Sequence, residues 1–266
     1  ILKLKNLDEI NKSDEFKIID INLNFKNPFK IRKKNASDFV INSLNLAHKL
    51  AIEKKDVQGI INCPLNKNLL PNKKFGVTEY LASKCNVKKD FESMLIRNKK
   101  LSVCPISTHI NINEVSKKLK TSLIVNKTKS IENWFRKTFK RKPKIAILGL
   151  NPHNAEYRKN SEEKKIIIPA ILKIKKLKIN ARGPLVADTI FIKDYKNFDV
   201  IIGMYHDQVL APFKSLFKFD AINITVGLRY LRVSPDHGVA VDLIGKNKAN
   251  PDSLFECINF VSKYKG

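Results

Sequence analysis

Apolar and polar positions along the chain alternate in segments with either a helical or a strand period. Residues 36–55, ASDFVINSLNLAHKLAIEKK, carry apolar side chains at helical spacing and predict an amphipathic helix. Residues 113–140 and 161–176 predict two more helices, and Pro169 should kink the second of these or delay its start. Short apolar runs predict strands at QGIINCPL, KLSVCPIST, PKIAILGL, FDVIIGMYHD and AINITVGL. Strands that alternate with helices favour an α/β fold with a mostly parallel sheet and helices on both faces.

The length and composition limit the class of protein. A chain of 266 residues can form one large domain or two smaller ones. It has no run of 18 apolar residues, so no membrane segment is predicted, and its first residues lack the apolar core of a signal peptide. The four cysteines are too far apart for a zinc knuckle or a disulfide scaffold. We therefore expect a cytoplasmic protein with no membrane partner.

The net charge of +26 raises the question of a nucleic-acid partner, because clustered basic residues release counterions from phosphate backbones. Only eight of the 51 basic residues are arginines, and the lysines are spread along the whole chain. Proteins that read the grooves of nucleic acids favour arginine for its bidentate fork. No nucleic-acid partner is therefore expected, whereas the charge would attract anionic substrates such as phosphate esters.

Three of the five histidines follow predicted strands: His109 after SVCPIST, His153 after IAILGLNP and His206 after DVIIGMY. Parallel strands end at the same edge of a sheet, where α/β proteins bind ligands. Imidazole is a common metal ligand, and three of them leave positions open for a substrate oxygen. The pattern indicates a metal site. Three unrelated histidines at loop starts are the alternative, since spacing does not establish proximity.

Polar residues near the same predicted strand ends are further candidates for the site. Asp188, in GPLVADTIF, is placed to orient an imidazole or accept a substrate proton, or else to cap a helix from Thr189 onward. Lys214, Asn223 and Arg232 lie near the late strands and are suited to hold a phosphate or a carboxylate. Arg232 is the strongest of these candidates because arginine is scarce in this chain.

Five motifs in order, LGLNPH, GPLVADTIF, GMYHDQVLAPFK, INITVGLRYLRVSPDHG and GKNKANPDSL, resemble those of the 4-hydroxythreonine-4-phosphate dehydrogenase family. The resemblance begins at about residue 36 and continues to the C-terminus. It implies two α/β/α domains related to isocitrate and isopropylmalate dehydrogenases, with the active site in the interdomain cleft. The first domain would comprise residues 1–105 with 210–266. The second would comprise residues 106–209 and carry most metal ligands.

The resemblance also implies roles for individual residues. The metal ligands would be His109, His153 and His206, in a site completed across a homodimer interface. The catalytic residues would be Asp188 and His206, and the substrate-binding residues would be Thr78, Lys214, Asn223 and Arg232. The implied cofactors are NAD or NADP and a divalent metal ion, which could be Zn, Co, Ni, Fe or Mg.

The implied substrate is a small phosphorylated hydroxy acid. The family oxidises 4-phosphooxy-L-threonine with NAD to 2-amino-3-oxo-4-phosphooxybutanoate, which decarboxylates to 3-amino-2-oxopropyl phosphate in pyridoxal 5'-phosphate biosynthesis. Two alternatives stay open. One is a sister dehydrogenase of D-erythronate or D-threonate 4-phosphate, and the other is a catalytically silent, metal-binding paralogue.

The chain departs from the family's pattern at three places. Val77 replaces the histidine of the family's Gly-His-Thr-Glu motif, so one hydrogen-bond donor to the substrate should be lost or supplied elsewhere. The family's glycine-rich stretch after His153 reads here Asn-Ala-Glu-Tyr-Arg-Lys-Asn, whose side chains should narrow that loop. The family also opens with a strand and a Gly/Pro-rich loop, and this chain is expected to lack that segment.

Overall fold

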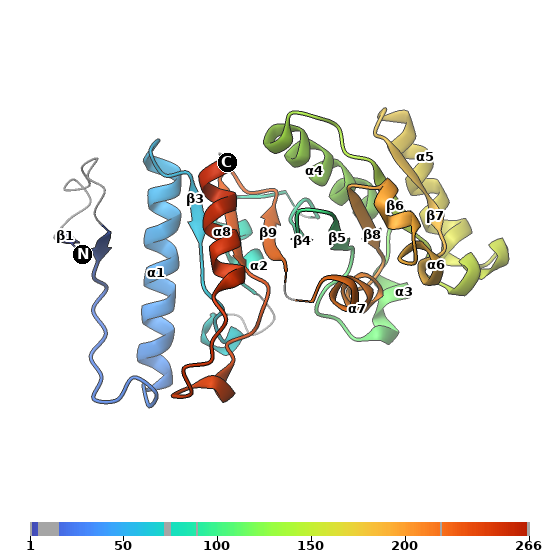
Figure 1. The fold of residues 1–266 in the computed structure, drawn as a ribbon. Helices are drawn as coiled ribbons and strands as arrows, with labels where there is room; N and C mark the ends of the chain where they lie inside the picture. The colour runs from blue at the N-terminus through green and yellow to red at the C-terminus, as the bar shows by residue number, and fades with distance from the viewer. Residues whose placement is uncertain (1, 5–15, 72–75, 89, 219, 265–266) are drawn as a thin grey trace.

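The centre of the molecule is an eight-stranded sheet with the order β3-β10-β9-β4-β5-β8-β6-β7 (Figure 1). A computed structural model describes residues 2–4, 16–71, 76–88, 90–218 and 220–264. The strands of the sheet are β3 (Gly59–Ile61), β4 (Ser93–Arg97), β5 (Ser102–Pro105), β6 (Ile145–Leu148), β7 (Ala181–Leu185), β8 (Val200–Gly203), β9 (Ile222–Val226) and β10 (Leu231–Pro235). A separate parallel pair is formed by β1 (Leu2–Leu4) and β2 (Lys17–Ile19).

Helices of the described chain alternate with most of these strands, as the hydrophobic pattern predicts, but no described helix separates β4 from β5 or β9 from β10. The helices are α1 (Lys33–Glu53), α2 (Val77–Lys84), α3 (Ile112–Lys118), α4 (Thr121–Phe139), α5 (Ile168–Lys176), α6 (Ala187–Ile190), α7 (His206–Phe217) and α8 (Asp252–Lys263). The predicted helix over 113–140 is interrupted at Leu119 and Lys120, which have extended backbones. None of the described helices has the length and apolarity needed to cross a membrane.

Proline has the expected effect on the helix predicted over 161–176. A π-helical turn, η4 (Glu163–Ile167), comes first, and the regular helix α5 begins at Ile168 with Pro169 in its first turn. A proline is tolerated there because the first amides of a helix have no partner within the helix. Pro169 thus delays the start of the α-helix.

The pairings within the large sheet are mostly parallel, so the predicted α/β class is confirmed. The parallel pairs are β3–β10, β5–β8, β8–β6 and β6–β7. The antiparallel pairs are β10–β9, β9–β4 and β4–β5, in the middle of the sheet. Strands of both predicted domains therefore belong to one continuous sheet, and β5 pairs with β8 where they meet. The domain boundaries themselves stay a prediction.

Apolar residues on alternate sides of each strand build two core layers. In β6, Ile145 and Ile147 pack with residues of α4 and α5, whereas Ala146 and Leu148 pack with residues of α7. Figure 1 shows α4 and α5 beside β6, β7 and β8, with α7 below them in the view. Because both faces of these strands are covered, their sequences read as continuous apolar runs. Ligands then have access mainly at the strand ends and at any polar surface of the sheet.

Candidate functional site

Neighbouring strands β9 and β10 carry polar side chains at alternate positions. In β9, Ile222, Ile224 and Val226 belong to the core, so Asn223 and Thr225 point to the opposite face. In β10, Leu231 and Val233 belong to the core, so Arg232 and Ser234 share that opposite face. Ser234 pairs directly with Asn223 in the register of the two strands. Because side chains alternate between the two faces of a strand, these four residues form a polar surface on one face of the sheet.

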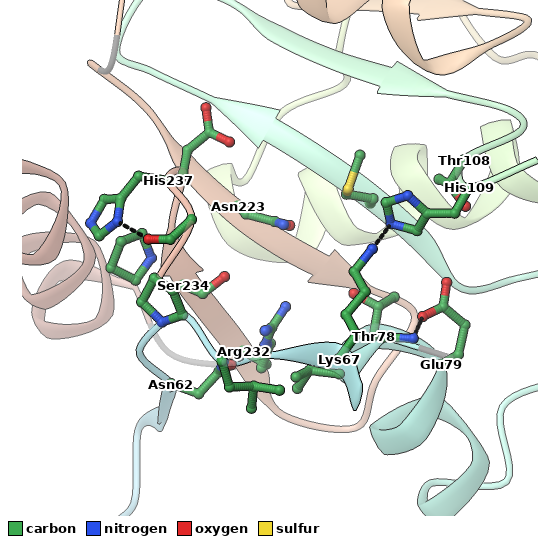
Figure 2. A pocket seen from close by; sticks show the side chains of 18 of the residues that line it. Asn62, Lys67, Thr78, Glu79, Thr108, His109, Asn223, Arg232, Ser234 and His237 are labelled. Atoms are coloured by element: carbon green, nitrogen blue, oxygen red, sulfur yellow. Dashed lines mark hydrogen bonds between the residues drawn. The ribbon is translucent and has the colours of Figure 1, made fainter. Parts of the chain in front are cut away.

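A cavity of about 390 Å³ lies over this polar surface. All four predicted substrate-binding residues and one predicted metal ligand line it: Thr78, Lys214, Asn223, Arg232 and His109. Figure 2 shows that its side chains come from segments far apart in the sequence, with Asn62 and Lys67 on one side and His237 on another. The predicted residues His153, Asp188 and His206 are not among the residues that line it.

Arg232 is fixed inside the protein by hydrogen bonds to two neighbouring segments. Its Nε donates to Asn62 Oδ1 at 2.6 Å, and its Nη1 donates to Thr225 Oγ1 at 2.8 Å. The hydroxyls of Thr225 and Thr78 share a further hydrogen bond at 3.1 Å. Burial lowers the pKa of Arg232 to about 10, so the guanidinium stays charged at neutral pH. The result is an oriented cation beside the cavity.

Lys214 and Asp236 form an ion pair at another part of the cavity wall. The Nζ of Lys214 lies 3.2 Å from Asp236 Oδ2. Burial raises the pKa of Asp236, and the positive charge of Lys214 opposes this rise. Nearby, Asn223 Oδ1 is buried without a hydrogen-bond partner among the described residues. A buried acceptor without a partner is costly, so Asn223 is suited to accept a hydrogen bond from a ligand.

His109 and His206 lie together at the carboxyl ends of β5 and β8. Their ring centroids are 6.0 Å apart, as the parallel pairing of the two strands predicts. Burial lowers the pKa of His109, and the charge of Lys67 lowers it further. Lys67 Nζ donates to His109 Nε2 at 2.8 Å, while His206 Nδ1 donates to Asp207 Oδ1 at 2.6 Å. Asp207 therefore orients an imidazole and lies in the first turn of α7.

His153 lies with Asp188 instead. Its Nε2 is 3.7 Å from Asp188 Oδ2, and both side chains are exposed. Val186 is the N-cap residue of α6, so the alternative that Asp188 caps this helix is wrong. Within the described part of the chain, no group of three His, Cys, Asp or Glu side chains is placed to hold one metal ion. One chain thus brings two of the three histidines together and leaves the third elsewhere.

A buried glutamate holds the loop that carries His153, and the sequence reasoning did not find it. Glu163 is fully buried, and its Oε1 accepts hydrogen bonds at 2.8 Å from the backbone amides of Leu150 and Asn151. Burial acts to raise the pKa of the Glu163 carboxyl, but the hydrogen bonds from Asn151 and Leu150 lower the pKa overall. The segment from His153 to Tyr157 that follows has left-handed backbone angles.

Gln208 joins the ends of β6 and β8. Its Nε2 donates to the carbonyl of Gly149 at 2.7 Å, and its Oε1 accepts from the Met204 amide at 2.7 Å. A Cβ on Gly149 would clash with Asn154 Oδ1, so a larger residue there would displace the Asn154 side chain. The glycine and the glutamine together fix the spacing of the strand ends that precede His153 and His206.

The Gly76-Val77-Thr78-Glu79 segment forms the start of α2. The Gly76 amide donates to Glu79 Oε2 at 2.8 Å, which ties the first turn of the helix. Val77 lines the cavity and packs against an apolar cluster that includes Leu44 and Leu81. Thr78 keeps its predicted place beside the polar face, whereas Val77 offers no side-chain hydrogen bond. The first turn of α2 is therefore closed by Glu79 with a valine at position 77.

Comparison with known proteins identifies the family of this chain. The sequence model of the family described as "Pyridoxal phosphate biosynthetic protein PdxA" matches residues 2–261. The chain belongs to the PdxA family. The resemblance seen in the motifs is thereby confirmed over nearly the whole chain.

Individual relatives of this PdxA family member carry the names of dehydrogenases. The 4-hydroxythreonine-4-phosphate dehydrogenase of Sulfurihydrogenibium sp. (strain YO3AOP1) is 36% identical over 265 residues, which is 97% of this chain and 80% of the relative. A protein of Oceanobacillus iheyensis named "Putative D-threonate 4-phosphate dehydrogenase" is 36% identical over 222 residues, which is 81% of this chain and 66% of the relative. These names support an oxidoreductase.

The fold is also that of solved structures in the family. The crystal structure of a 4-hydroxythreonine-4-phosphate dehydrogenase from Klebsiella pneumoniae has a TM-score of 0.79 at 30% sequence identity. The match covers 92% of this chain and 75% of that one. The α/β class inferred from the hydrophobic pattern is therefore shared with an experimentally solved relative.

Proposed function

We propose that this PdxA family member oxidises the secondary alcohol of 4-phosphooxy-L-threonine with NAD. The product, 2-amino-3-oxo-4-phosphooxybutanoate, then loses CO₂ to give 3-amino-2-oxopropyl phosphate in pyridoxal 5'-phosphate biosynthesis. The observation that carries the proposal is the cavity over β9 and β10, where Thr78, Lys214, Asn223 and Arg232 converge. A substrate with two anionic groups matches this wall, which is rich in cations and hydrogen-bonding groups.

The chain's own residues would bind and orient the substrate. The oriented guanidinium of Arg232 and the ammonium of Lys214 would hold its anionic groups, and Asn223 would accept a hydrogen bond from its amino group. Thr78 would hold the carbon backbone of the substrate beside β9 and β10. We propose the carboxylate of Asp188, which lies beside His153, as the general base that accepts the proton from the substrate hydroxyl.

The histidines fit a divalent metal ion by the chemistry of their donors. His109 and His206 lie within reach of one another, and the lowered pKa of His109 favours the neutral imidazole that a metal needs. We propose that His109 and His206 of one protomer and His153 of its partner hold the ion in a homodimer. Once bound, a divalent ion supplies Lewis acidity that favours loss of the hydroxyl proton. Zn, Co, Ni, Fe and Mg are the candidate metals.

The nicotinamide cofactor has room next to the substrate cavity. A second cavity of about 910 Å³ shares His237 and Gly238 with the first and extends toward Phe217 and Phe255. This volume and its apolar lining suit a nucleotide-sized ligand. NAD or NADP bound there would reach the substrate at the shared wall. The reaction needs that contact because hydride passes directly from the substrate carbon to the nicotinamide.

A second candidate substrate is D-threonate or D-erythronate 4-phosphate. The names of the Oceanobacillus iheyensis and Salmonella typhi relatives favour it, since both refer to D-threonate 4-phosphate. These compounds carry a hydroxyl where 4-phosphooxy-L-threonine carries an amino group. Asn223, as a hydrogen-bond acceptor, accommodates either group. A catalytically silent paralogue is the third candidate, and it would turn over none of the three compounds.

NAD reduction with each of the three phosphorylated acids, with and without added divalent metal, tests the proposal. We expect the highest kcat/KM with 4-phosphooxy-L-threonine and a dependence on metal. His153→Ala should abolish the metal-dependent rate, while its circular dichroism spectrum and melting temperature stay those of the wild type, because His153 is exposed. Full turnover by His153→Ala would contradict the three-histidine site, and preference for a sugar-acid phosphate would replace the proposed substrate.

We also propose the reducing cytoplasm as the location of the protein. Its cysteines, Cys63, Cys85, Cys104 and Cys257, are all free thiols, and three of them are buried. Free thiols in such positions are usual for proteins of reducing compartments.

A further inference from the structure

Lys127 lies on the face of α4 that otherwise packs into the core. Ile124, Thr128 and Ile131 are fully buried on this face, and Lys127 has the matching helical spacing of three and four residues. Only 8% of Lys127 is exposed. Lysine is rarely so deeply buried unless a carboxylate or another partner compensates its charge.

The ammonium of Lys127 forms neither a hydrogen bond nor an ion pair within the described chain. Lys127 instead lines the substrate cavity, as do Thr108 and His109. Burial raises the pKa of the Cys104 thiol to about 11, and the positive charge of Lys127 acts to lower this pKa. A buried cation on a cavity wall without a counter-charge points to an anionic ligand.

The other cations of the cavity differ from Lys127 because each has a partner in the protein. Lys67 donates to His109, and Lys214 pairs with Asp236. Arg232 donates to the side chains of Asn62 and Thr225. Charge-assisted hydrogen bonds are strongest where the cation has been desolvated and still has donors to offer. Lys127 is mostly buried and still has donors to offer to a ligand.

We propose that Lys127 binds the phosphoryl group of the substrate and makes the cavity selective for phosphorylated hydroxy acids. This inference rests on the proposed function, which provides a substrate with a phosphate at one end and a carboxylate at the other. A phosphate dianion gains more from an uncompensated ammonium than a carboxylate does, because the attraction scales with charge. Arg232 and Lys214, on other elements of the wall, then hold the carboxylate end.

Titration of inorganic phosphate into the full-length protein, followed by calorimetry, tests this role without any turnover. Lys127→Met keeps the length and apolar character of the side chain and removes its charge. We expect it to weaken phosphate binding about 10- to 100-fold, the usual loss for one charge-assisted hydrogen bond. Lys127→Arg should retain part of the affinity. The matched control is Lys129→Met on the same helix, which does not line the cavity and should bind phosphate like the wild type.

A second measurement separates ligand binding from a structural role. Without phosphate, Lys127→Met should melt at the wild-type temperature or above it, because the substitution removes a buried charge that lacks a partner. A lower melting temperature would show that Lys127 supports the fold, and the proposal would be wrong. Unchanged phosphate affinity in Lys127→Met, or no phosphate binding by the wild type, would overturn it equally.

Unphosphorylated 4-hydroxythreonine identifies which end of the substrate Lys127 contacts. We expect its binding to be the same in the wild type and in Lys127→Met. An equal loss for the phosphorylated and unphosphorylated compounds would assign Lys127 to the carboxylate and overturn the phosphoryl assignment. Phosphate binding that depends on Lys127, without NAD reduction on any of the three phosphorylated acids, would contradict only the proposed function.

Discussion

At the scale of single residues, the site depends on side chains whose positions are fixed before a ligand arrives. Arg232 is the clearest case, because Asn62 and Thr225 take two of its N–H groups and leave the guanidinium in one orientation. A cation held in this way loses little conformational entropy when it binds an anion. On β9, the strand next to that of Arg232, Asn223 adds a buried hydrogen-bond acceptor.

Replacement of Arg232 by lysine should therefore impair substrate binding although the charge is kept. An ammonium cannot make the two directed bonds to Asn62 and Thr225, and one buried acceptor would lose its donor. We expect KM for the phosphorylated substrate to rise by about 10- to 100-fold, which corresponds to about 1.4 to 2.7 kcal/mol. Steady-state kinetics measure this change.

The control for this prediction is Arg229→Lys, at an exposed position in the turn before β10. Its KM should equal that of the wild type. If Arg232→Lys also kept the wild-type KM, the fixed guanidinium would have no part in binding.

At the scale of elements, the loop after β6 takes its shape from the helix that follows it. Glu163, in the π-helical turn before α5, accepts hydrogen bonds from the amides of Leu150 and Asn151. These amides would otherwise be left without partners where the strand ends. The carboxylate thereby fixes the start of the segment that carries His153.

Glu163→Gln should destabilise the protein by about 2 kcal/mol, because the amide group lacks the charge that strengthens these hydrogen bonds. The folded-state pKa of Glu163 is lowered, so its stabilising contribution is fully present above the unfolded-state pKa of about 4.3. The contribution is lost as the pH falls through the folded-state value. Urea denaturation at pH 7 and at pH 3 measures both effects.

The difference in unfolding free energy between wild type and Glu163→Gln should accordingly be large at pH 7 and smaller at pH 3. Glu156→Gln serves as the control, since Glu156 is exposed in the same loop and its carboxylate bonds no backbone amide among the described residues, so the stability of this variant should equal that of the wild type at both pH values. An equal difference at both pH values would mean that the carboxylate charge is not what holds the loop.

Several of the elements could be predicted from the sequence because their signals are local. Apolar runs with turn residues at their ends located β5, β6 and β8, and parallel pairing then placed His109 beside His206. Alternation within β9 and β10 likewise accounts for the shared face of Asn223 and Arg232. The first placement follows from the predicted parallel pairing, whereas the second also requires the antiparallel pairing of β10 with β9, which was not predicted from the sequence.

Contacts between distant segments could not be predicted in the same way. Asn62 and Arg232 are 170 positions apart, and no local pattern links them. Lys67 and His109 are 42 positions apart, and the lysine lies in a polar loop that resembles many others. The sequence does place Lys127 on the apolar face of the helix, which is unusual for a lysine. In a chain so rich in lysine this position is hard to recognise.

At the scale of the whole molecule, the arrangement of the three histidines suggests that the functional unit contains two chains. His109 and His206 lie 6.0 Å apart by ring centroids, whereas His153 lies against Asp188. The described residues of one chain contain no group of three metal-ligating side chains in suitable positions. A homodimer with twofold symmetry would supply the third ligand from the partner.

Mixing two inactive variants tests this arrangement directly. His153→Ala and His206→Ala should each be inactive as homodimers, yet a mixed dimer would contain one site with all three histidines. After unfolding and refolding of an equal mixture, we expect about a quarter of the wild-type activity, because half of the dimers are mixed and each has one intact site of two. NAD reduction and metal content per dimer are the measurements.

His109→Ala mixed with His206→Ala provides the contrasting control, since the proposed site takes both residues from the same chain. This mixture should stay inactive. Activity in the second mixture, or none in the first, would contradict the proposed sharing of ligands.

The continuous sheet also limits how the protein can move when it binds its ligands. A hinge between the halves would have to separate β5 from β8, which are joined by backbone hydrogen bonds and covered by core side chains. Closure around a substrate would therefore come from loops beyond the strand ends, such as residues 236–251 between β10 and α8. Small-angle X-ray scattering should then give nearly the same radius of gyration with and without ligands, while amide exchange slows in those loops.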